Sequence, residues 1–221
     1  MPRTYFERQL EKIQEDMLAL AMRVETAMER SVTALSDGNV ELANQVIQDD
    51  VIINDTRYDI EEMCIELIAT QQPLASDLRT IASVLHIVGD LERMGDHAEG
   101  IARVALMMGS EPPLMSYSGI QKMAEITKGM MLASLEAFKD RDTVRAREIS
   151  DQDDEVDALY DEILSELLVL MTEDKDKIER ATHLTWVAHN LERIADRVTN
   201  ICERIVYLVD GKIHEMNVSK Y

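Results

Sequence analysis

Pairs of acidic residues spaced by four recur along the sequence and are its most promising chemical groups. Residues four apart on a helix lie on one face, with Cβ atoms about 5–6 Å apart. Two carboxylates at that spacing repel each other unless a cation lies between them. A repeated pattern of this kind predicts metal binding, and the eight candidate ligands are Asp55 with Asp59, Glu92 with Asp96, Asp157 with Asp161, and Glu192 with Asp196.

A site made of carboxylates suits a hard or borderline cation such as Mg, Ca, Mn or iron, because oxygen is the ligand atom these ions prefer. The Glu-x-x-His motif of ferritin-like di-iron proteins is absent from the sequence. His86 and His189 precede the acidic motifs by one or two helical turns and are candidate nitrogen ligands. The alternative for each single pair is an ordinary solvated helix face.

Arg93 and Arg193 directly follow the glutamates of two of these pairs. We expect them to form surface ion pairs with neighbouring acids rather than a phosphate site, since neither lies at a helix N-terminus or in a Gly-rich loop. Counted along antiparallel helices, the facing acidic pairs differ in level by about five to seven residues, or roughly 8–10 Å. Four other acids lie closer in level and are further candidates: Asp49, Asp50, Asp153 and Asp154.

The elements that carry these residues are predicted to be long helices. Apolar residues recur at spacings of three and four, and Gly and Pro together number only 12 in 221 residues. Breaks are expected at Asp37-Gly38-Asn39, Pro73, Pro112-Pro113, Asp140-Arg141-Asp142 and Glu173–Asp176. The six predicted helices cover residues 4–35, 39–70, 75–108, 117–139, 142–171 and 176–209.

The second half of the sequence repeats the first. Residues 90–102 match residues 190–202 at an offset of 100, and Asp55-Thr-Arg-Tyr-Asp matches Asp157-Ala-Leu-Tyr-Asp at an offset of 102. Two matches in the same order indicate a duplicated three-helix unit. We therefore predict an all-α fold of two tandem, pseudo-symmetric antiparallel three-helix bundles, with domains at 1–110 and 115–221. Trp186, which aligns with His86, is expected to pack between the bundles.

The composition narrows the class of function. The chain has 43 acidic and 23 basic residues, a net charge of −20, which disfavours nucleic acid and anionic lipid as partners. No secretory signal or membrane-length apolar stretch is present, and Cys64 and Cys202 are expected to be reduced core thiols. The protein is therefore expected to be cytoplasmic. The sequence contains no nucleophile with a base and no phosphate loop, so we expect no enzymatic activity.

The repeated motif Leu-Glu-Arg-[Ile/Met]-[Ala/Gly]-Asp, at 91–96 and 191–196 of a six-helix chain, resembles the PhoU family of bacteria. That resemblance covers essentially the whole chain. It implies twin three-helix bundles, often dimeric, whose acidic motifs hold iron or zinc in some members; manganese also fits the carboxylates. One departure is Asn190, which stands where the first unit has Asp90 and predicts a weaker second metal site.

The resemblance also implies a function and partners. It implies a homodimeric regulator that acts with the ATPase subunit of the phosphate ABC transporter and with a sensor histidine kinase to repress phosphate uptake and phosphate-starvation genes. Any membrane location is then expected to depend on those protein partners. Two alternatives are a metal-binding or metal-sensing helical bundle and an assembly scaffold.

Overall fold

Helices joined by short connections form the part described by the computed structural model, residues 2–213 and 215–216, and no strand occurs there. The elements confirm the predicted fold class and five of the six predicted helices to within a few residues. They are α1 (Pro2–Asp37), α2 (Val40–Gln71), α3 (Ala75–Met108), α4 (Ser118–Asp140), α5 (Thr143–Asp151), α6 (Asp153–Glu173), the 3₁₀ turn η1 (Lys175–Lys177) and α7 (Ile178–Asp210).

The predicted helix at 142–171 is interrupted, and this part of the prediction is wrong. The amide of Gln152 donates to the carbonyl of Ile149, and the amide of Glu155 donates to the carbonyl of Gln152, at 3.1 and 3.0 Å. These bonds reach back three residues rather than four, so the chain tightens locally and α5 ends before α6 begins. Asp153, which opens α6, is buried.

The turns between helices follow from a few residues. Gly38 (φ 62°) and Arg141 (φ 53°) both adopt the left-handed conformation that ends a helix. The next residue caps the following helix in each case: the side chain of Asn39 accepts from the amide of Leu42, and that of Asp142 accepts from the amides of Val144 and Arg145. The predicted turns at 37–39 and 140–142 are therefore confirmed, and they are equivalent in the two units.

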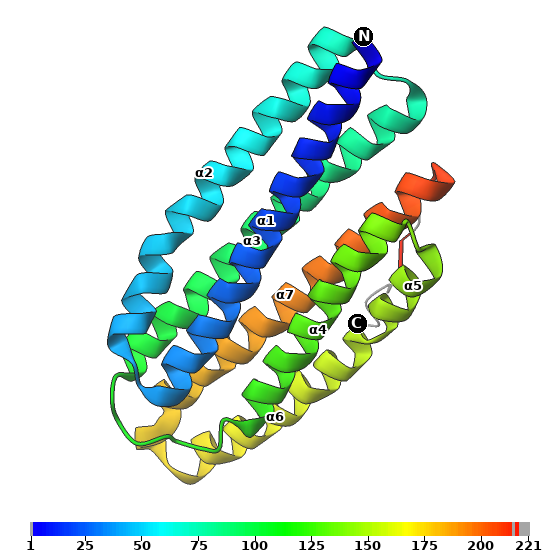
Figure 1. Cartoon of the computed structure of the whole chain (residues 1–221). Helices are drawn as coiled ribbons and strands as arrows, with labels where there is room; N and C mark the ends of the chain where they lie inside the picture. Colours follow the sequence, from blue (N-terminus) through cyan, green and yellow to red (C-terminus); the bar gives the residue numbers. More distant parts are fainter. Residues whose placement is uncertain (1, 214, 217–221) are drawn as a thin grey trace.

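Helices α3 and α7 form the centre of the molecule and pack together along their lengths (Figure 1). Helices α1 and α2 complete one bundle with α3, and α4 with α5 and α6 completes the other with α7. The central pair is antiparallel, because Ser83 contacts Arg204 while His97 contacts Asn190. One apolar core runs through both bundles, and Cys64 and Cys202 lie in it as free thiols, as predicted.

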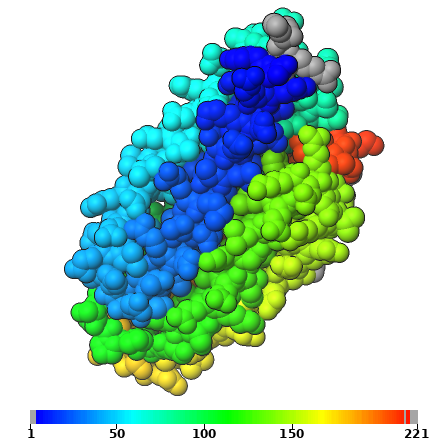
Figure 2. All heavy atoms as spheres, viewed as in Figure 1, coloured from blue at the N-terminus to red at the C-terminus, as the bar shows by residue number. Residues whose placement is uncertain are grey.

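Helix α1 of the first bundle also contacts α4 of the second, and the two helices meet along one face of the molecule (Figure 2). Lys128 of α4 forms ion pairs with Glu25 and Glu29 of α1, at 2.7 and 2.8 Å. Gln121 of α4 donates to the hydroxyl of Ser36 at 3.2 Å. These contacts and the α3–α7 packing hold the acidic motifs of the two units in a fixed relation.

No helix in the described part of the chain combines the length and the apolar character needed to cross a membrane.

Candidate functional site

The buried positions of α2 and α5–α6 show how the two units correspond. They repeat at an offset of 103, as do the turns at Gly38 and Arg141, so the predicted offset of 102 for these helices is wrong by one residue. One residue turns a side chain by about 100° around a helix, which moves it to another face. Asp157 therefore corresponds to Asn54, and Asp161 to Tyr58. The buried pairs are Ala43 with Ala146, Val46 with Ile149, Ile53 with Val156, and Ile60 with Ile163.

The first acidic cluster lies between α2 and α3 and consists of Asp50, Glu92, Asp96 and Glu99. Burial raises the pKa of Asp50 to about 6, and the negative charges of Glu99, Asp96 and Glu92 add to the rise. Oδ2 of Asp50 accepts from Asn54 at 2.7 Å, whereas its buried Oδ1 accepts no hydrogen bond from the described residues. Asp50 is therefore a carboxyl held close to other acids.

The second acidic cluster lies between α6 and α7 and is centred on Asp157, Glu192 and Asp196. Burial raises the pKa of Glu192 to about 7, and the charges of Asp196 and Asp157 raise it further against the opposing charge of Arg193. Burial likewise raises the pKa of Asp157, with Asp196, Asp154 and Asp161 contributing. The structure thus brings the predicted acids of this unit together, with Asp161 exposed at the edge.

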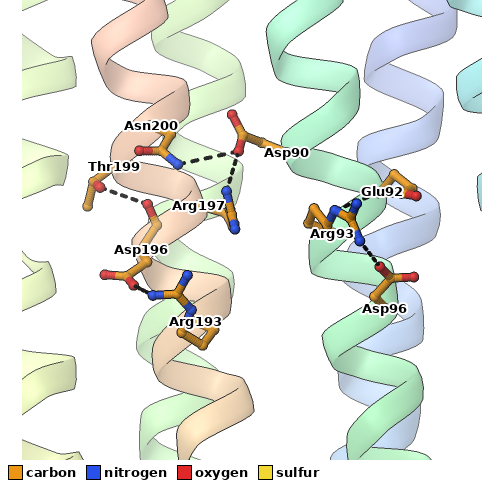
Figure 3. Close-up of polar contacts among 9 residues, drawn as sticks. All are labelled: Asp90, Glu92, Arg93, Asp96, Arg193, Asp196, Arg197, Thr199 and Asn200. Atoms are coloured by element: carbon orange, nitrogen blue, oxygen red, sulfur yellow. Dashed lines mark hydrogen bonds and ion pairs between the residues drawn. The ribbon is translucent and has the colours of Figure 1, made fainter.

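Arg93 and Arg193 form the predicted ion pairs with these clusters (Figure 3). Arg93 contacts Glu92 at 3.4 Å and Asp96 at 3.0 Å. Arg193 contacts Asp196 at 2.8 Å. Each arginine thus offsets part of the negative charge of its own cluster.

Asp55 and Asp59 are not part of the first cluster. Both are exposed on α2, whereas Asp50 and Asn54 lie on the side of α2 that faces the acids of α3. The predicted offset of 102 aligned Asp157 with Asp55, whereas the offset of 103 aligns it with Asn54. Asp55 lies about 100° further around the helix than Asn54 and so points to another face. Ligation by Asp55 or Asp59 stays a prediction that their placement does not support.

Glu99 is the member of the first cluster that we did not predict. It follows Glu92 and Asp96 at positions i, i+4 and i+7, so it shares their helix face, and that spacing could have revealed it. Thr199 occupies the corresponding place in α7, where its hydroxyl donates to the carbonyl of Asp196 at 2.7 Å. Asp50 was among the further candidates because of its position along α2. It lies close enough to Glu92 and Asp96 for their charges to raise its pKa, so this prediction of its position is confirmed.

The histidines and the tryptophan near the motifs lie mostly at the surface. Nδ1 of His189 is 3.3 Å from Oε2 of Glu192, so His189 is next to the second cluster. His86 is exposed. Trp186 is 48% exposed and lies beside His183, with ring centroids 5.4 Å apart, so the prediction that it packs between the bundles is wrong.

Two equivalent polar contacts join α3 to α7 between the clusters. Asp90 accepts from Arg197 at 3.2 Å and from Asn200 at 3.3 Å (Figure 3). At the matching place Nδ1 of His97 lies 2.8 Å from Oδ1 of Asn190. The Asp90–Arg197 pair in one place corresponds to the Asn190–His97 pair in the other. Asn190 therefore faces His97 at the interface between the bundles, where Asp90 of the first unit faces Arg197. That Asn190 marks a weaker second metal site stays a prediction.

Two glycines of α3, Gly95 and Gly100, allow neighbouring helices to approach it closely near the motif of the first unit. A Cβ on Gly95 would lie 3.1 Å from Cγ2 of Ile53 and 3.4 Å from Oδ1 of Asp50, so the absence of a side chain lets α2 approach α3. A Cβ on Gly100 would lie 3.2 Å from Oδ1 of Asn190. Gly89 differs from these two, because nothing lies within 4 Å of a Cβ there.

The clusters offer the donor type for a hard cation. Their carboxylate oxygens, the raised pKa values and the Oδ1 of Asp50 without a hydrogen bond fit a bound positive charge. In the described residues, however, no three His, Cys, Asp or Glu side chains converge closely enough to hold a metal ion. Arg93 and Arg193 occupy the acids instead. Binding a metal would therefore require these side chains to rearrange.

The comparisons with known proteins agree with the duplicated architecture. The family model described as the PhoU domain matches this chain twice, at residues 17–105 and 120–205. The chain belongs to the PhoU family. Each match to the PhoU domain contains one Leu-Glu-Arg motif. The predicted domain limits of 1–110 and 115–221 stay predictions.

Curated relatives and solved structures match the PhoU assignment over nearly the whole chain. Phosphate-specific transport system accessory protein PhoU homologs of Aquifex aeolicus and Clostridium acetobutylicum are 43% and 39% identical, covering 93% and 98% of this chain and 93% and 100% of theirs. The crystal structure of PhoU from Pseudomonas aeruginosa is 36% identical with a TM-score of 0.89, covering 94% of this chain and 100% of that one.

Proposed function

We propose that this chain is an accessory protein of a phosphate transport system and restrains phosphate uptake when phosphate is plentiful. The observation that carries the proposal is the pair of PhoU-domain matches, together with relatives of that name that align over almost their full length. The family resemblance further supports partners of two kinds: the ATPase subunit of the phosphate ABC transporter and a sensor histidine kinase. The chain then acts by binding rather than by catalysis, from the cytoplasmic face of the membrane.

Phosphate uptake by living cells tests this role. A strain in which the gene for this protein is deleted should take up ³²P-labelled phosphate faster than its parent in phosphate-rich medium, and it should express phosphate-starvation genes there. Expressing the protein from a plasmid should reverse both effects. Equal uptake in all three strains would refute the proposed function, because an accessory protein that restrains the transporter must change the flux.

We also propose that the two acidic clusters bind divalent or trivalent cations such as iron, zinc or manganese, and that binding stabilises the fold. The raised pKa values of Asp50 and Glu192 support this, because a cation removes the repulsion that causes part of the rise. A ligand at about 100 times its Kd adds about 2.7 kcal/mol to the free energy of unfolding. The clusters would then stabilise the fold only when a metal ion is bound, so the stability of the protein would depend on the metal available to it.

The metal proposal is tested by thermal unfolding with added metal or with chelator. The double variant Glu92→Gln/Asp96→Asn should lose the rise in Tm contributed by the first cluster, and Glu192→Gln/Asp196→Asn that of the second. The matched control is Asp55→Asn/Asp59→Asn, which has the same spacing and the same charge change on an exposed face. If the control variant loses the metal response while the others keep it, the assignment of the clusters is wrong.

Homodimerisation is a further part of the proposal and rests on the family resemblance. Sedimentation equilibrium would give a mass near twice the 25.1 kDa of one chain. A mass of one chain at tens of micromolar would contradict it.

A further inference from the structure

The outward face of α2 carries a row of exposed apolar side chains that the fold does not use. Val51, Tyr58 and Ile65 are 57%, 56% and 61% exposed. They are seven residues apart, so they lie within about 20° of one direction around the helix and span about 21 Å along it. The α2 atoms form one long edge of the molecule in Figure 2, and no other helix covers that edge in this view.

The second unit shows that the bundle itself does not require apolar residues there. At the offset of 103 the corresponding residues are Asp154, Asp161 and Leu168, so two of the three positions are acidic in α6. The buried side of α2 is formed by other residues, among them Ile53 and Ile60. Val51 and Tyr58 therefore represent a difference between the units that core packing does not explain.

Two exposed acids lie within the same row. Asp55 and Glu62 come four residues after Val51 and Tyr58, so apolar and acidic side chains alternate along the face. This 4–3 spacing is the one at which a second helix packs along a first. Any helix that covers the apolar residues must therefore place side chains opposite these two carboxylates.

The charge decides which occupant fits. A second copy of the chain packed on the same face would bring Asp55 and Glu62 against its own acidic row, where like charges repel. Anionic lipid is disfavoured for the same reason. A helix with Lys or Arg between its apolar residues would pair with both carboxylates while it covers the apolar groups.

We propose that this face, made of Val51, Asp55, Tyr58, Glu62 and Ile65 and here called the α2 stripe, is the docking surface for a basic amphipathic helix of a partner protein. Tyr58 is the central anchor, since tyrosine is enriched among the residues that dominate binding energy. The guanidinium of Arg57 lies 4.7 Å from the centre of the Tyr58 ring and limits its movement. The α2 stripe is separate from both acidic clusters, so the proposal does not depend on metal binding or on phosphate transport.

The test uses the full chain and two synthetic peptides of 22 residues. Both are amphipathic helices with leucine at every seventh position; one carries Lys and Arg beside the leucines, and the other carries Glu. The basic peptide should bind, and Val51→Ser/Tyr58→Ser should weaken it at least tenfold in a fluorescence anisotropy titration. Leu168→Ser/Val169→Ser is the matched control, because these residues are similarly exposed on α6. Circular dichroism confirms that each variant folds.

Charge exchange makes the test specific. Asp55→Lys/Glu62→Lys should weaken the basic peptide and make the acidic peptide bind instead. The proposal is overturned if the basic peptide does not bind, or if the α6 control loses as much affinity as the α2 variant, since binding would then reflect overall charge. It is also overturned if wild type self-associates and Tyr58→Ser abolishes that association, because the occupant would then be a second copy.

Discussion

Neutralising Glu192 should stabilise the protein at neutral pH, because its charge is held against burial and against Asp196 and Asp157. The side chain is only 15% exposed, so water screens it little. Its pKa is about 7 in the folded chain against an ordinary value of 4.5. At about 1.4 kcal/mol per pKa unit, this difference corresponds to a cost of up to about 3 kcal/mol once the group is ionised.

The sign of the pH dependence follows from the raised pKa. Below pH 4.5 the carboxyl is protonated in both states and costs nothing. As the pH rises to about 7 the unfolded chain releases the proton while the folded chain holds it, so the free energy of unfolding falls. Glu192→Gln should therefore match wild type near pH 4 and exceed it by up to about 3 kcal/mol at pH 8, where Gln carries no charge.

Urea unfolding followed by circular dichroism, at a series of pH values and with chelator present, measures this difference. The matched control is Glu166→Gln, which removes the same charge from an exposed site on α6. The reasoning is refuted if Glu192→Gln changes stability equally at pH 4 and pH 8, or if Glu166→Gln stabilises as much.

Two further predictions concern packing around α3 and α7. Gly89→Ala should raise the free energy of unfolding by about 1 kcal/mol, because alanine favours the helix and the new Cβ meets nothing within 4 Å. Gly95→Ala should be less stable than Gly89→Ala by about 1 kcal/mol or more, because its new Cβ would lie 3.1 Å from Ile53. Equal free energies of unfolding for the two variants in urea would contradict the crowding at Gly95. Arg197→Ala should cost about 2–3 kcal/mol, because it removes an ion-pair partner of Asp90, whose side chain is 14% exposed. A change below 0.5 kcal/mol would show that the pair does not contribute.

The sequence predicted the helices and their duplication well, because long amphipathic patterns and turn residues act locally. The turn at Asp140–Asp142 could be predicted for this reason, and so could the one at Asp37–Asn39. The break at Gln152 could not, since no glycine or proline marks it. It rests on two hydrogen bonds that reach back three residues, and several residue types can form those.

The candidate site was predicted only in part. The motifs of α3 and α7 were found because they repeat with the same residues. The partner acids on α2 depend on register, and the similarity of Asp55–Asp59 to Asp157–Asp161 pointed to a register one residue from the one that burial shows. Asp50 could be named as a candidate from its level along the helix, but only the packing of α2 on α3 distinguishes it from Asp49, which pairs with Arg30. The surroundings of Asn190 and Asp90 could not be predicted either, because the residues that face them, His97 and Arg197, lie on the other central helix.

The central claim is that this chain is an accessory protein of phosphate transport, and direct binding to the transporter tests it most plainly. Isothermal titration of the purified chain into the purified ATPase subunit of the phosphate ABC transporter from the same organism should give saturable, stoichiometric binding. The ATPase subunit of an unrelated ABC transporter serves as the control and should not bind. If the phosphate transporter's subunit also gives no heat at tens of micromolar, or binds no better than the unrelated one, the account is contradicted.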